Sequence, residues 1–291
     1  MIKVWCKDIL CKISPVIMTK LMFRYNFKKK LDLKNPKDIN EKMQYLKLYT
    51  YYNNPVITQC VDKFRVRQYL KDRGHEALSA KLIDGAYTSA APIREHWDIY
   101  PDKFVIKCNH GCEYNILVTD KNKMDVEQVV KTVNKWLHED FWTRYCEPQY
   151  RFVPKCVFVE EYLADDIETY KFYCFNGEPK FSYVSTNGEA GEKDLYLDYF
   201  DLNWNHMDVT LYPHLHRKGN IPKPKNYDEM LDLCRELSKD FPFVRVDLYN
   251  VDGVIYFSEF TFIPTGGNMK ITPQKYLDEW GTMLTLPKSS K

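Results

Sequence analysis

Two apolar runs near the C-terminus each contain one acidic residue, and a short turn separates them. The runs are Val244-Arg-Val-Asp-Leu-Tyr249 and Val254-Ile-Tyr-Phe-Ser-Glu-Phe-Thr-Phe262, and the turn is Asn250-Val-Asp-Gly253. A glycine at this point supplies the positive φ that tight hairpin loops require. The pattern therefore predicts an antiparallel β-hairpin that brings Asp247 and Glu259 to the same end of a sheet.

A carboxylate surrounded by Val, Tyr and Phe is costly to bury unless a cation or strong hydrogen bonds compensate it. Two such groups close together favour a hard divalent ion, and Mg²⁺ held by carboxylates and phosphate oxygens fits this description. The alternative is that Asp247 and Glu259 are both structural and that one of them pairs with Arg245. The hairpin alone leaves both interpretations open.

Length and composition indicate a folded protein with more than one lobe. The chain has 291 residues, of which 44% are hydrophobic and 15% aromatic, so a large core is expected. No apolar stretch reaches the ~20 residues that span a bilayer. The nine cysteines include no CxxC pair, and Cys108, Cys156 and Cys174 fall in predicted strands, where reduced cysteine packs as a small core residue. A reducing, cytoplasmic location is therefore expected.

The N-terminal segment is strongly basic. Residues 1–37 contain ten Lys or Arg and two Asp, and their apolar residues predict a helix broken near Pro15. A basic amphipathic segment is typical of peripheral contact with an anionic membrane, here the inner face of the cell membrane. The alternative is a helix that packs on the protein's own body. Nucleic-acid binding is not expected, because no aromatic platform motif accompanies the charge.

The order of predicted elements indicates an α+β protein. We expect a helical N-terminal arm over 1–55, an N-terminal subdomain over 56–100, a central lobe over 101–163 and a C-terminal lobe over 164–291. After the arm we expect helices at 62–74, 124–139 and 227–241. Strands are expected at 80–84, 103–108, 116–119 and 156–163. A hairpin is expected at 169–174 and 179–185, and a long loop at 186–225.

Lys107 follows Phe-Val-Ile near the end of a predicted strand, beside a loop that contains His110 and Gly111. A lysine in this position needs an anion, and a phosphate is a natural one. Amides around Gly111 would add hydrogen-bond donors to such a site. The alternative is a strand-end lysine that reaches solvent. The segment does not match the P-loop pattern.

Two other strands carry polar groups of interest. Glu160 and Glu161 end a strand that leads into Tyr162 and Leu163, and exposed backbone there would suit an adenine edge, although an ordinary acidic strand end is the alternative. Lys171 lies inside Tyr170-Lys-Phe-Tyr-Cys174 and is either a second phosphate ligand or a solvent-facing side chain on an alternating strand.

Several other chemistries are not indicated. His206, His214 and His216 match no familiar zinc spacing and have no cysteine among them, so no zinc site is predicted there. A serine nucleophile elbow and a GxGxxG turn after a strand are both missing from the sequence.

In this order, the pieces resemble the TupA-like ATP-grasp family of bacterial surface-polysaccharide gene clusters. The resemblance covers about residues 38–281. Its motifs are Asn40-Glu-Lys42, Asp62-Lys-Phe-Arg-Val-Arg67, Phe104-Val-Ile-Lys-Cys-Asn-His-Gly111, Val159-Glu-Glu-Tyr-Leu163, Tyr170-Lys-Phe172, Cys174-Phe-Asn-Gly177, Arg245-Val-Asp-Leu-Tyr249, and Glu259-Phe-Thr-Phe262 with Gly266-Gly267.

The resemblance implies an ATP-grasp fold in which two α+β lobes grip ATP and Mg²⁺ bridges its phosphates. It makes Asp247 and Glu259 metal ligands. Many ATP-grasp enzymes have Asn two residues after the second metal acid, and this chain has Thr261 there, whose hydroxyl is the third candidate ligand.

For the nucleotide, the resemblance implies that Lys107 contacts phosphate, together with Lys63 or Lys171. The His110-Gly111 loop belongs to the same site. The adenine-side hinge comprises Glu160, Glu161, Tyr162 and Leu163, and either Glu168 or Asp166 is the candidate for the ribose.

The implied reaction is ATP-dependent ligation of a carboxylate to a small amine through an acylphosphate, on a uronic acid sugar of a capsule or O-antigen. Arg245 and Lys171 are the catalytic candidates. Arg245 is the candidate for the substrate carboxylate, because a planar guanidinium matches it bidentately. The rivals are a sugar kinase, a nucleotide-binding module and a glycosyltransferase. The last would need a DxD motif after a strand, and Asp198-Tyr-Phe-Asp201 does not fit it.

Overall fold

The chain forms two compact units. The computed structural model describes residues 4–187, 195–211, 216–217 and 219–287. Unit 1 comprises residues 1–52, 145–148 and 166–291, and unit 2 comprises residues 53–144 and 149–165. Antiparallel sheets and mixed helices confirm the predicted α+β class. Among the described residues, no helix has the length and apolar character needed to cross a bilayer.

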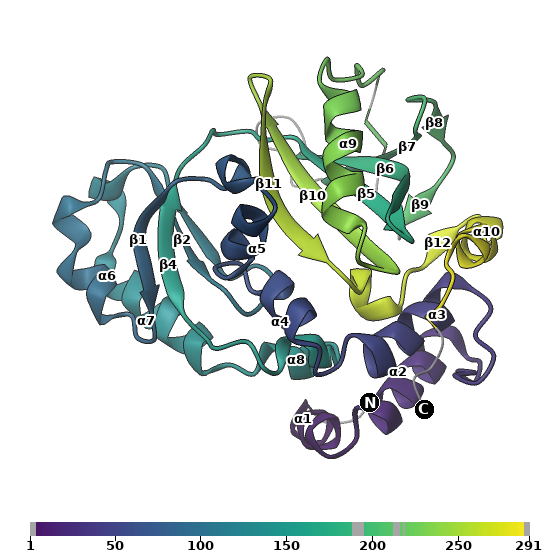
Figure 1. The fold of residues 1–291 in the computed structure, drawn as a ribbon. Helices are drawn as coiled ribbons and strands as arrows, with labels where there is room; N and C mark the ends of the chain where they lie inside the picture. The colour runs from purple at the N-terminus through teal and green to yellow at the C-terminus, as the bar shows by residue number, and fades with distance from the viewer. Residues whose placement is uncertain (1–3, 188–194, 212–215, 218, 288–291) are drawn as a thin grey trace. The chain divides into compact units, whose positions relative to one another are not determined.

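Unit 1 is built on a six-stranded antiparallel sheet in the order β11-β10-β5-β6-β7-β8 (Figure 1). A second sheet pairs β9 with β12. The strands are β5 (Thr169–Phe175), β6 (Glu178–Asn187), β7 (Leu195–Asp201), β8 (His206–Met207), β9 (Thr210–Leu211), β10 (Phe243–Val251), β11 (Val254–Thr261) and β12 (Ile271–Thr272).

Both predicted hairpins of unit 1 are confirmed. Asp252 and Gly253 have φ of 51° and 85° between β10 and β11, and Asn176 and Gly177 have φ of 52° and 82° between β5 and β6. Positive φ at both central residues matches the twist of the flanking strands. The predicted loop over 186–225 was wrong, because it contains β7, β8 and β9.

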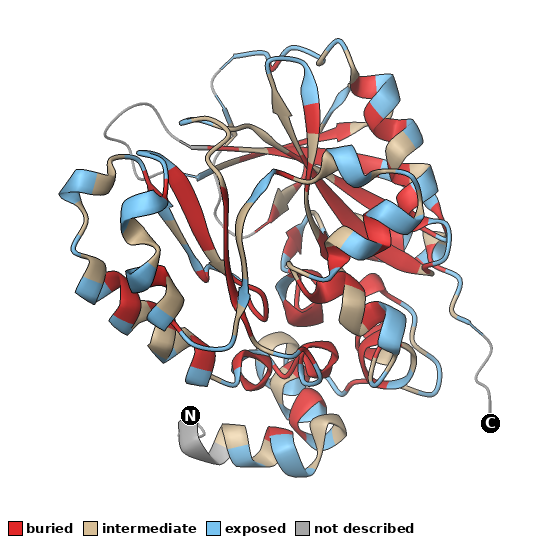
Figure 2. Cartoon of the chain, turned by 60° about the vertical axis from the view of Figure 1, so that its left-hand side comes forward, coloured by how far each residue is buried: buried red, intermediate tan, exposed pale blue. Residues whose placement is uncertain are grey.

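Helices cover the two faces of this sheet. Helix α9 (Tyr227–Ser238) contacts β5, β6 and β10. On the other face, Trp280 of α10 (Lys275–Met283) stacks on Phe181, with ring centroids 4.2 Å apart. Buried residues follow the strands and exposed residues follow the outer helix faces (Figure 2). The alternation of strand side chains therefore gives the sheet two distinct buried surfaces.

Unit 1 also contains the N-terminal helices, which are α1 (Val4–Ile13), α2 (Pro15–Phe27), α3 (Ile39–Tyr45) and a π-helical turn (Leu46–Thr50). The predicted break near Pro15 is confirmed, and Ser14 caps α2 through the amide of Ile17. Helix α2 buries Met18 and Phe23, so the arm does pack on the protein's own body.

Helix α3 holds the segment that follows β11. The Asn40 amide donates to the Met269 carbonyl and accepts from the Met269 amide, each at 2.9 Å. Gln44 donates to the carbonyls of Gly266 and Gly267 at 3.1 and 2.7 Å. The short helix Pro264–Gly267, with its positive φ values, is thus fixed by buried side-chain amides.

Unit 2 contains a four-stranded antiparallel sheet in the order β1-β4-β2-β3. Its elements are α4 (Pro55–Val61), α5 (Val66–Asp72), β1 (Leu82–Tyr87), α6 (Ala91–Glu95), β2 (Phe104–Cys108), β3 (Asn115–Val118), α7 (Val126–His138), α8 (Phe141–Arg144) and β4 (Val157–Glu161), with 3-10 turns at Glu76–Leu78, Trp97–Ile99 and Lys121–Lys123. A further 3-10 turn, Pro148–Tyr150, begins at the last residue of a unit 1 segment. Helix α5 starts later than predicted, since the Asp62 carboxylate accepts from the amides of Phe64 and Arg65 and holds a turn there.

Candidate functional site

The candidate site of unit 1 is a row of cross-strand partners on the six-stranded sheet. Glu259 on β11 pairs with Asp247 on β10, which pairs with Lys171 on β5, which pairs with Tyr183 on β6. Directly opposed residues share one face of a sheet. The register therefore places two predicted metal ligands and one catalytic candidate side by side.

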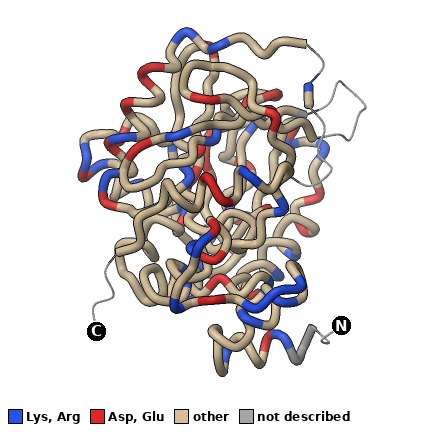
Figure 3. Tube along the Cα trace, turned by 90° about the vertical axis from the view of Figure 1, so that its right-hand side faces the viewer, with Lys and Arg blue, Asp and Glu red and all other residues tan. Residues whose placement is uncertain are grey.

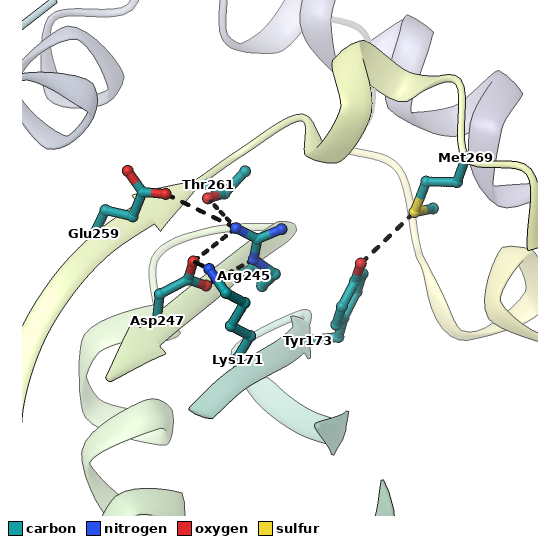
Figure 4. Close-up of polar contacts among 7 residues, drawn as sticks. All are labelled: Lys171, Tyr173, Arg245, Asp247, Glu259, Thr261 and Met269. Atoms are coloured by element: carbon teal, nitrogen blue, oxygen red, sulfur yellow. Dashed lines mark hydrogen bonds and ion pairs between the residues drawn. The ribbon is translucent and has the colours of Figure 1, made fainter. Parts of the chain in front are cut away.

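Thr261 and Arg245 are cross-strand partners two residues further along the same strands. The Arg245 guanidinium donates to Asp247 through Nε–Oδ1 and Nη2–Oδ2, both at 2.6 Å, and Nη2 also donates to Thr261 Oγ1 at 2.8 Å. Glu259 Oε1 lies 3.9 Å from the same Nη2 (Figure 4). All three predicted metal ligands thus converge on one cationic nitrogen.

Lys171 is a second cation of this cluster. Its Nζ donates to Asp247 Oδ2 at 2.7 Å, and its side chain is 18% exposed while that of Asp247 is fully buried. Burial is the largest single effect on the ammonium and opposes its charge, but Asp247, Tyr183 and Glu259 together outweigh it, and the pKa of Lys171 is raised. The ammonium of Lys171 therefore has a buried carboxylate as its partner and still reaches the surface in part.

The donor set fits Mg²⁺. Two carboxylates and a hydroxyl are hard oxygen donors, which this ion prefers, and they already surround a positive charge in the form of the guanidinium. Asp247 has both oxygens engaged by Arg245 and Lys171, whereas the Glu259 side chain is 26% exposed. The structural interpretation of the hairpin is thus represented by the pair of Asp247 with Arg245, and the same oxygens are donors of the kind that Mg²⁺ prefers.

In unit 2, Glu160 lies between two cations. Arg67 Nη2 is 2.7 Å from Glu160 Oε2, and Lys107 Nζ contacts Glu160 Oε1. Arg67 also donates to the Ala80 carbonyl at 2.7 Å. Lys107 is 20% exposed, so its charge has a carboxylate partner and still reaches the surface. Lys107 and Glu160 were predicted to be site residues, whereas no role was predicted for Arg67. The one signal for Arg67 was its position in the basic motif Asp62-Lys-Phe-Arg-Val-Arg67.

The His110-Gly111 loop packs into unit 2. His110 is 2% exposed, and its Nε2 lies 3.0 Å from the Trp136 carbonyl. Burial lowers its pKa to about 4, so the ring is neutral at physiological pH. A Cβ on Gly111 would approach the Phe141 ring to 2.7 Å. Close packing against this ring therefore explains why position 111 is a glycine.

The remaining predicted residues have mostly local partners. Glu161 Oε1 accepts from the Lys81 amide at 2.6 Å, and the Tyr162 hydroxyl donates to Asp165 at 2.9 Å. The Lys63 amide donates to the Asn109 carbonyl at 3.1 Å. Leu163 is half-buried and Asp166 is exposed.

Glu168, in unit 1, accepts from Tyr170 at 2.7 Å and from Arg217 at 3.0 Å. His206 and His216 both approach Asp198, whereas His214 lies outside the described residues. From the sequence, these histidines were considered without Asp198, because Asp198 comes from the strand that was predicted to be a loop.

Comparisons with known proteins identify similar sequences and folds. A family model described as TupA-like ATPgrasp matches residues 41–285. Similar solved structures include D-alanine–D-alanine ligase from Bacillus anthracis, with 16% identity, a TM-score of 0.44 and coverage of 78% of this chain and 60% of that one. No curated protein matches the chain significantly.

Two further structures show the same range of similarity. The ATP-grasp ligase PsnB complexed with minimal precursor has 14% identity, a TM-score of 0.38 and coverage of 72% and 55%. N5-carboxyaminoimidazole synthetase from Staphylococcus aureus has 13% identity, a TM-score of 0.35 and coverage of 70% and 44%. The chain therefore spans about half of the length of these proteins.

Proposed function

This chain belongs to the TupA-like ATP-grasp family, and from that premise we propose that it is an ATP- and Mg²⁺-dependent ligase that joins a carboxylate to an amine. The observation that carries the proposal is the convergence of Asp247, Glu259 and Thr261 on one buried positive charge.

The roles in unit 1 follow from the chemistry of the cluster. Asp247, Glu259 and Thr261 would hold Mg²⁺, which when bound neutralises phosphate charge. Arg245 offers a planar fork of donors that matches a carboxylate, so we assign it to the substrate carboxylate. Lys171 keeps a positive charge beside Asp247 and supports the negative charge that accumulates during phosphoryl transfer.

The nucleotide roles are assigned from the family resemblance and from local chemistry. Lys107, which is paired with Glu160 and partly exposed, is assigned to phosphate, as are the Gly111 loop amides and Lys63. The strand end Glu160–Leu163 is assigned to the adenine and Glu168 to the ribose. His110, which is neutral and buried, contributes by holding the loop and not by charge.

The proposed reaction needs no protein nucleophile. A substrate carboxylate oxygen attacks the γ-phosphorus of ATP, and the bond to ADP breaks. The amine nitrogen then attacks the acyl carbon, inorganic phosphate leaves, and the nitrogen loses a proton to give an amide. Positioning and charge neutralisation supply most of the catalysis in such transfers. We propose a uronic acid of a capsular or O-antigen polysaccharide as the carboxylate, in keeping with the family.

The test is a screen of uronic acid sugars crossed with small amines, in which ADP is measured. We expect ADP release to require a carboxylate and an amine together, and the product to contain an amide and no phosphate. A phosphorylated hydroxyl product without an amine would indicate a sugar kinase. Consumption of a sugar nucleotide in the absence of ATP would contradict the ligase and support a glycosyltransferase.

We also propose that the protein works in the cytoplasm at the inner face of the cell membrane, with the N-terminal arm as the contact. Helix α2 buries one face but leaves Ile17, Leu21 and Tyr25 exposed at 52%, 43% and 66%. These residues recur every four positions, so they form one stripe. Ile13 of α1 is 75% exposed, and such a group of apolar side chains marks an interaction surface.

The charges beside this stripe suit an anionic surface. Lys20, Arg24 and Lys28 are exposed and each follows a residue of the stripe by three positions, and residues 9–31 contain no Asp or Glu. Blue segments gather near the end marked N in Figure 3. Basic residues near an anionic bilayer contribute ~1 kcal/mol each, and apolar insertion adds to this attraction.

We expect the protein to sediment with vesicles that contain phosphatidylglycerol and not with phosphatidylcholine vesicles. The variant Ile17→Ser/Leu21→Ser should bind at least tenfold more weakly, because burying one Leu or Ile is worth ~1.5–3 kcal/mol. The matched control is Leu117→Ser/Val254→Ser, at positions 50% and 53% exposed elsewhere. Equal binding by both variants would contradict the assignment of this surface.

A further inference from the structure

A second cluster of ligand-type side chains lies in unit 1, apart from the row that contains Asp247 and Glu259. Asp198 comes from β7, His206 from β8, and His216 from the segment after β9. One ligand atom from each lies within 4.8 Å of the others. Tyr199 pairs with Tyr183 of the row that contains Lys171. Because neighbouring residues in a strand point to opposite faces, Asp198 lies on the other face of the sheet.

The spacing of the ligand atoms matches that of a small tetrahedral site. Asp198 Oδ1 lies 3.2 Å from His206 Nε2 and 3.5 Å from His216 Nδ1. Bonds of ~2.0–2.2 Å to Zn²⁺ place tetrahedral ligands roughly 3.3–3.6 Å apart. An ion would therefore fit with small side-chain movements.

Other groups hold these side chains in position. The Arg217 amide donates to Asp198 Oδ2 at 3.0 Å, which leaves Oδ1 directed at the histidines. His216 Nε2 lies 3.5 Å from Thr210 Oγ1, so the hydroxyl can accept its proton while Nδ1 faces Asp198. Such outer contacts orient metal-binding histidines. Without an ion, His216 Nδ1 has an alternative partner in the Leu197 carbonyl at 3.1 Å.

The site is open on one side. The three residues line a cavity of about 650 Å³, and the side chains of His206 and His216 are 47% and 34% exposed while that of Asp198 is 4% exposed. An ion would thus have three protein ligands and a position for water. Two imidazoles and one carboxylate suit Zn²⁺ and similar transition metals, whereas Mg²⁺ prefers oxygen.

We propose that Asp198, His206 and His216 bind one divalent transition metal ion of the zinc class. The ion would join β7, β8 and residues 216–217. Arg217 of this segment pairs with Glu168 at 3.0 Å, so binding would also steady a residue of the proposed ribose contact. The metal site itself is independent of the proposed ligase activity.

The experiment uses the full chain after treatment with a chelator. Titration with Co²⁺, followed by visible absorption, and with Zn²⁺, followed by calorimetry, should show one equivalent bound with a Kd of about 10 µM or lower and a rise in Tm. His206→Gln should weaken binding at least tenfold, because even the loss of a group that only supports a ligand typically costs ~10–100-fold in affinity. The control His138→Gln, an exposed helical histidine, should bind as the wild type does.

Glu259→Gln separates the two metal sites, because it removes a proposed Mg²⁺ ligand and should leave Co²⁺ binding unchanged. Binding that survives His206→Gln, or that Glu259→Gln removes, would overturn the proposal. The absence of saturable binding would also overturn it and leave the three residues as a hydrogen-bonded group only.

Discussion

Replacing Glu259 by Gln is expected to lower the rate of ATP-dependent ADP formation at least a thousandfold while the protein stays folded. The carboxylate is more accessible than that of Asp247, with side chains 26% and 0% exposed. Its removal takes a negative charge from the proposed metal site at small structural cost. Groups that stabilise transition-state charge are typically worth ~10²–10³ in rate each, and loss of the ion adds to this.

The measurement is ADP release at saturating ATP, compared with Glu279→Gln, the same substitution at an exposed position of α10. Circular dichroism and Tm should match the wild type in both variants. A Glu259→Gln protein that keeps more than a tenth of the wild-type rate would remove this residue from the metal site.

Replacing Asp247 by Asn is expected to destabilise the protein as well as inactivate it. Asp247 is fully buried and is the partner of both Arg245 and Lys171. Breaking a buried pair leaves an uncompensated charge and costs ~3–5 kcal/mol. At ~2–4 °C per kcal/mol for a domain of 150–250 residues, the Tm should fall by about 10 °C.

Thermal unfolding checks this prediction, with Asp252→Asn in the exposed turn of the same hairpin as the control. The double variant Asp247→Asn/Lys171→Met should recover part of the lost Tm, because it removes one of the stranded cations. An unchanged Tm in Asp247→Asn would show that the charges of Arg245 and Lys171 do not depend on this carboxylate.

The hairpin could be predicted from the sequence because its signal is local. Apolar alternation and the Asp252-Gly253 turn give the strands and their connection, and the turn then fixes the register. That register makes Asp247 and Glu259 direct partners. The link to Lys171 on β5 is long-range, and no local pattern in the sequence specifies which strand lies next to β10.

The sequence could not show which acidic residues of the cluster contact which basic ones. Arg245 and Asp247 lie on the same strand, two residues apart, so a contact between them was open to prediction. The convergence of Glu259 and Thr261 on the same guanidinium depends on the register of β10 and β11, which shifts after Asp247. In the same way, burial of His110 depends on Tyr114 and Trp136 packing around it.

The strands at 195–211 were missed for another reason. Leu195, Leu197 and Tyr199 alternate as in a strand, but glycine, histidine and proline on either side resemble a loop. Residues 195–201 form a strand because they pair with β6, which is a tertiary interaction. Short strands of two residues, such as β8 and β9, carry almost no sequence signal of their own.

The amide bonds between α3 and the segment after β11 also have a consequence for biosynthesis. Asn40 and Met269 are 229 residues apart in the chain. At ~5–20 residues per second, the ribosome would deliver the second partner roughly 10–50 s after the first. During that time the buried surface of α3, including Ile39 and Met43, has no partner from this segment. The N-terminal helices should therefore be protected by chaperones on the ribosome, and unit 2, which is complete by residue 165, can fold before them.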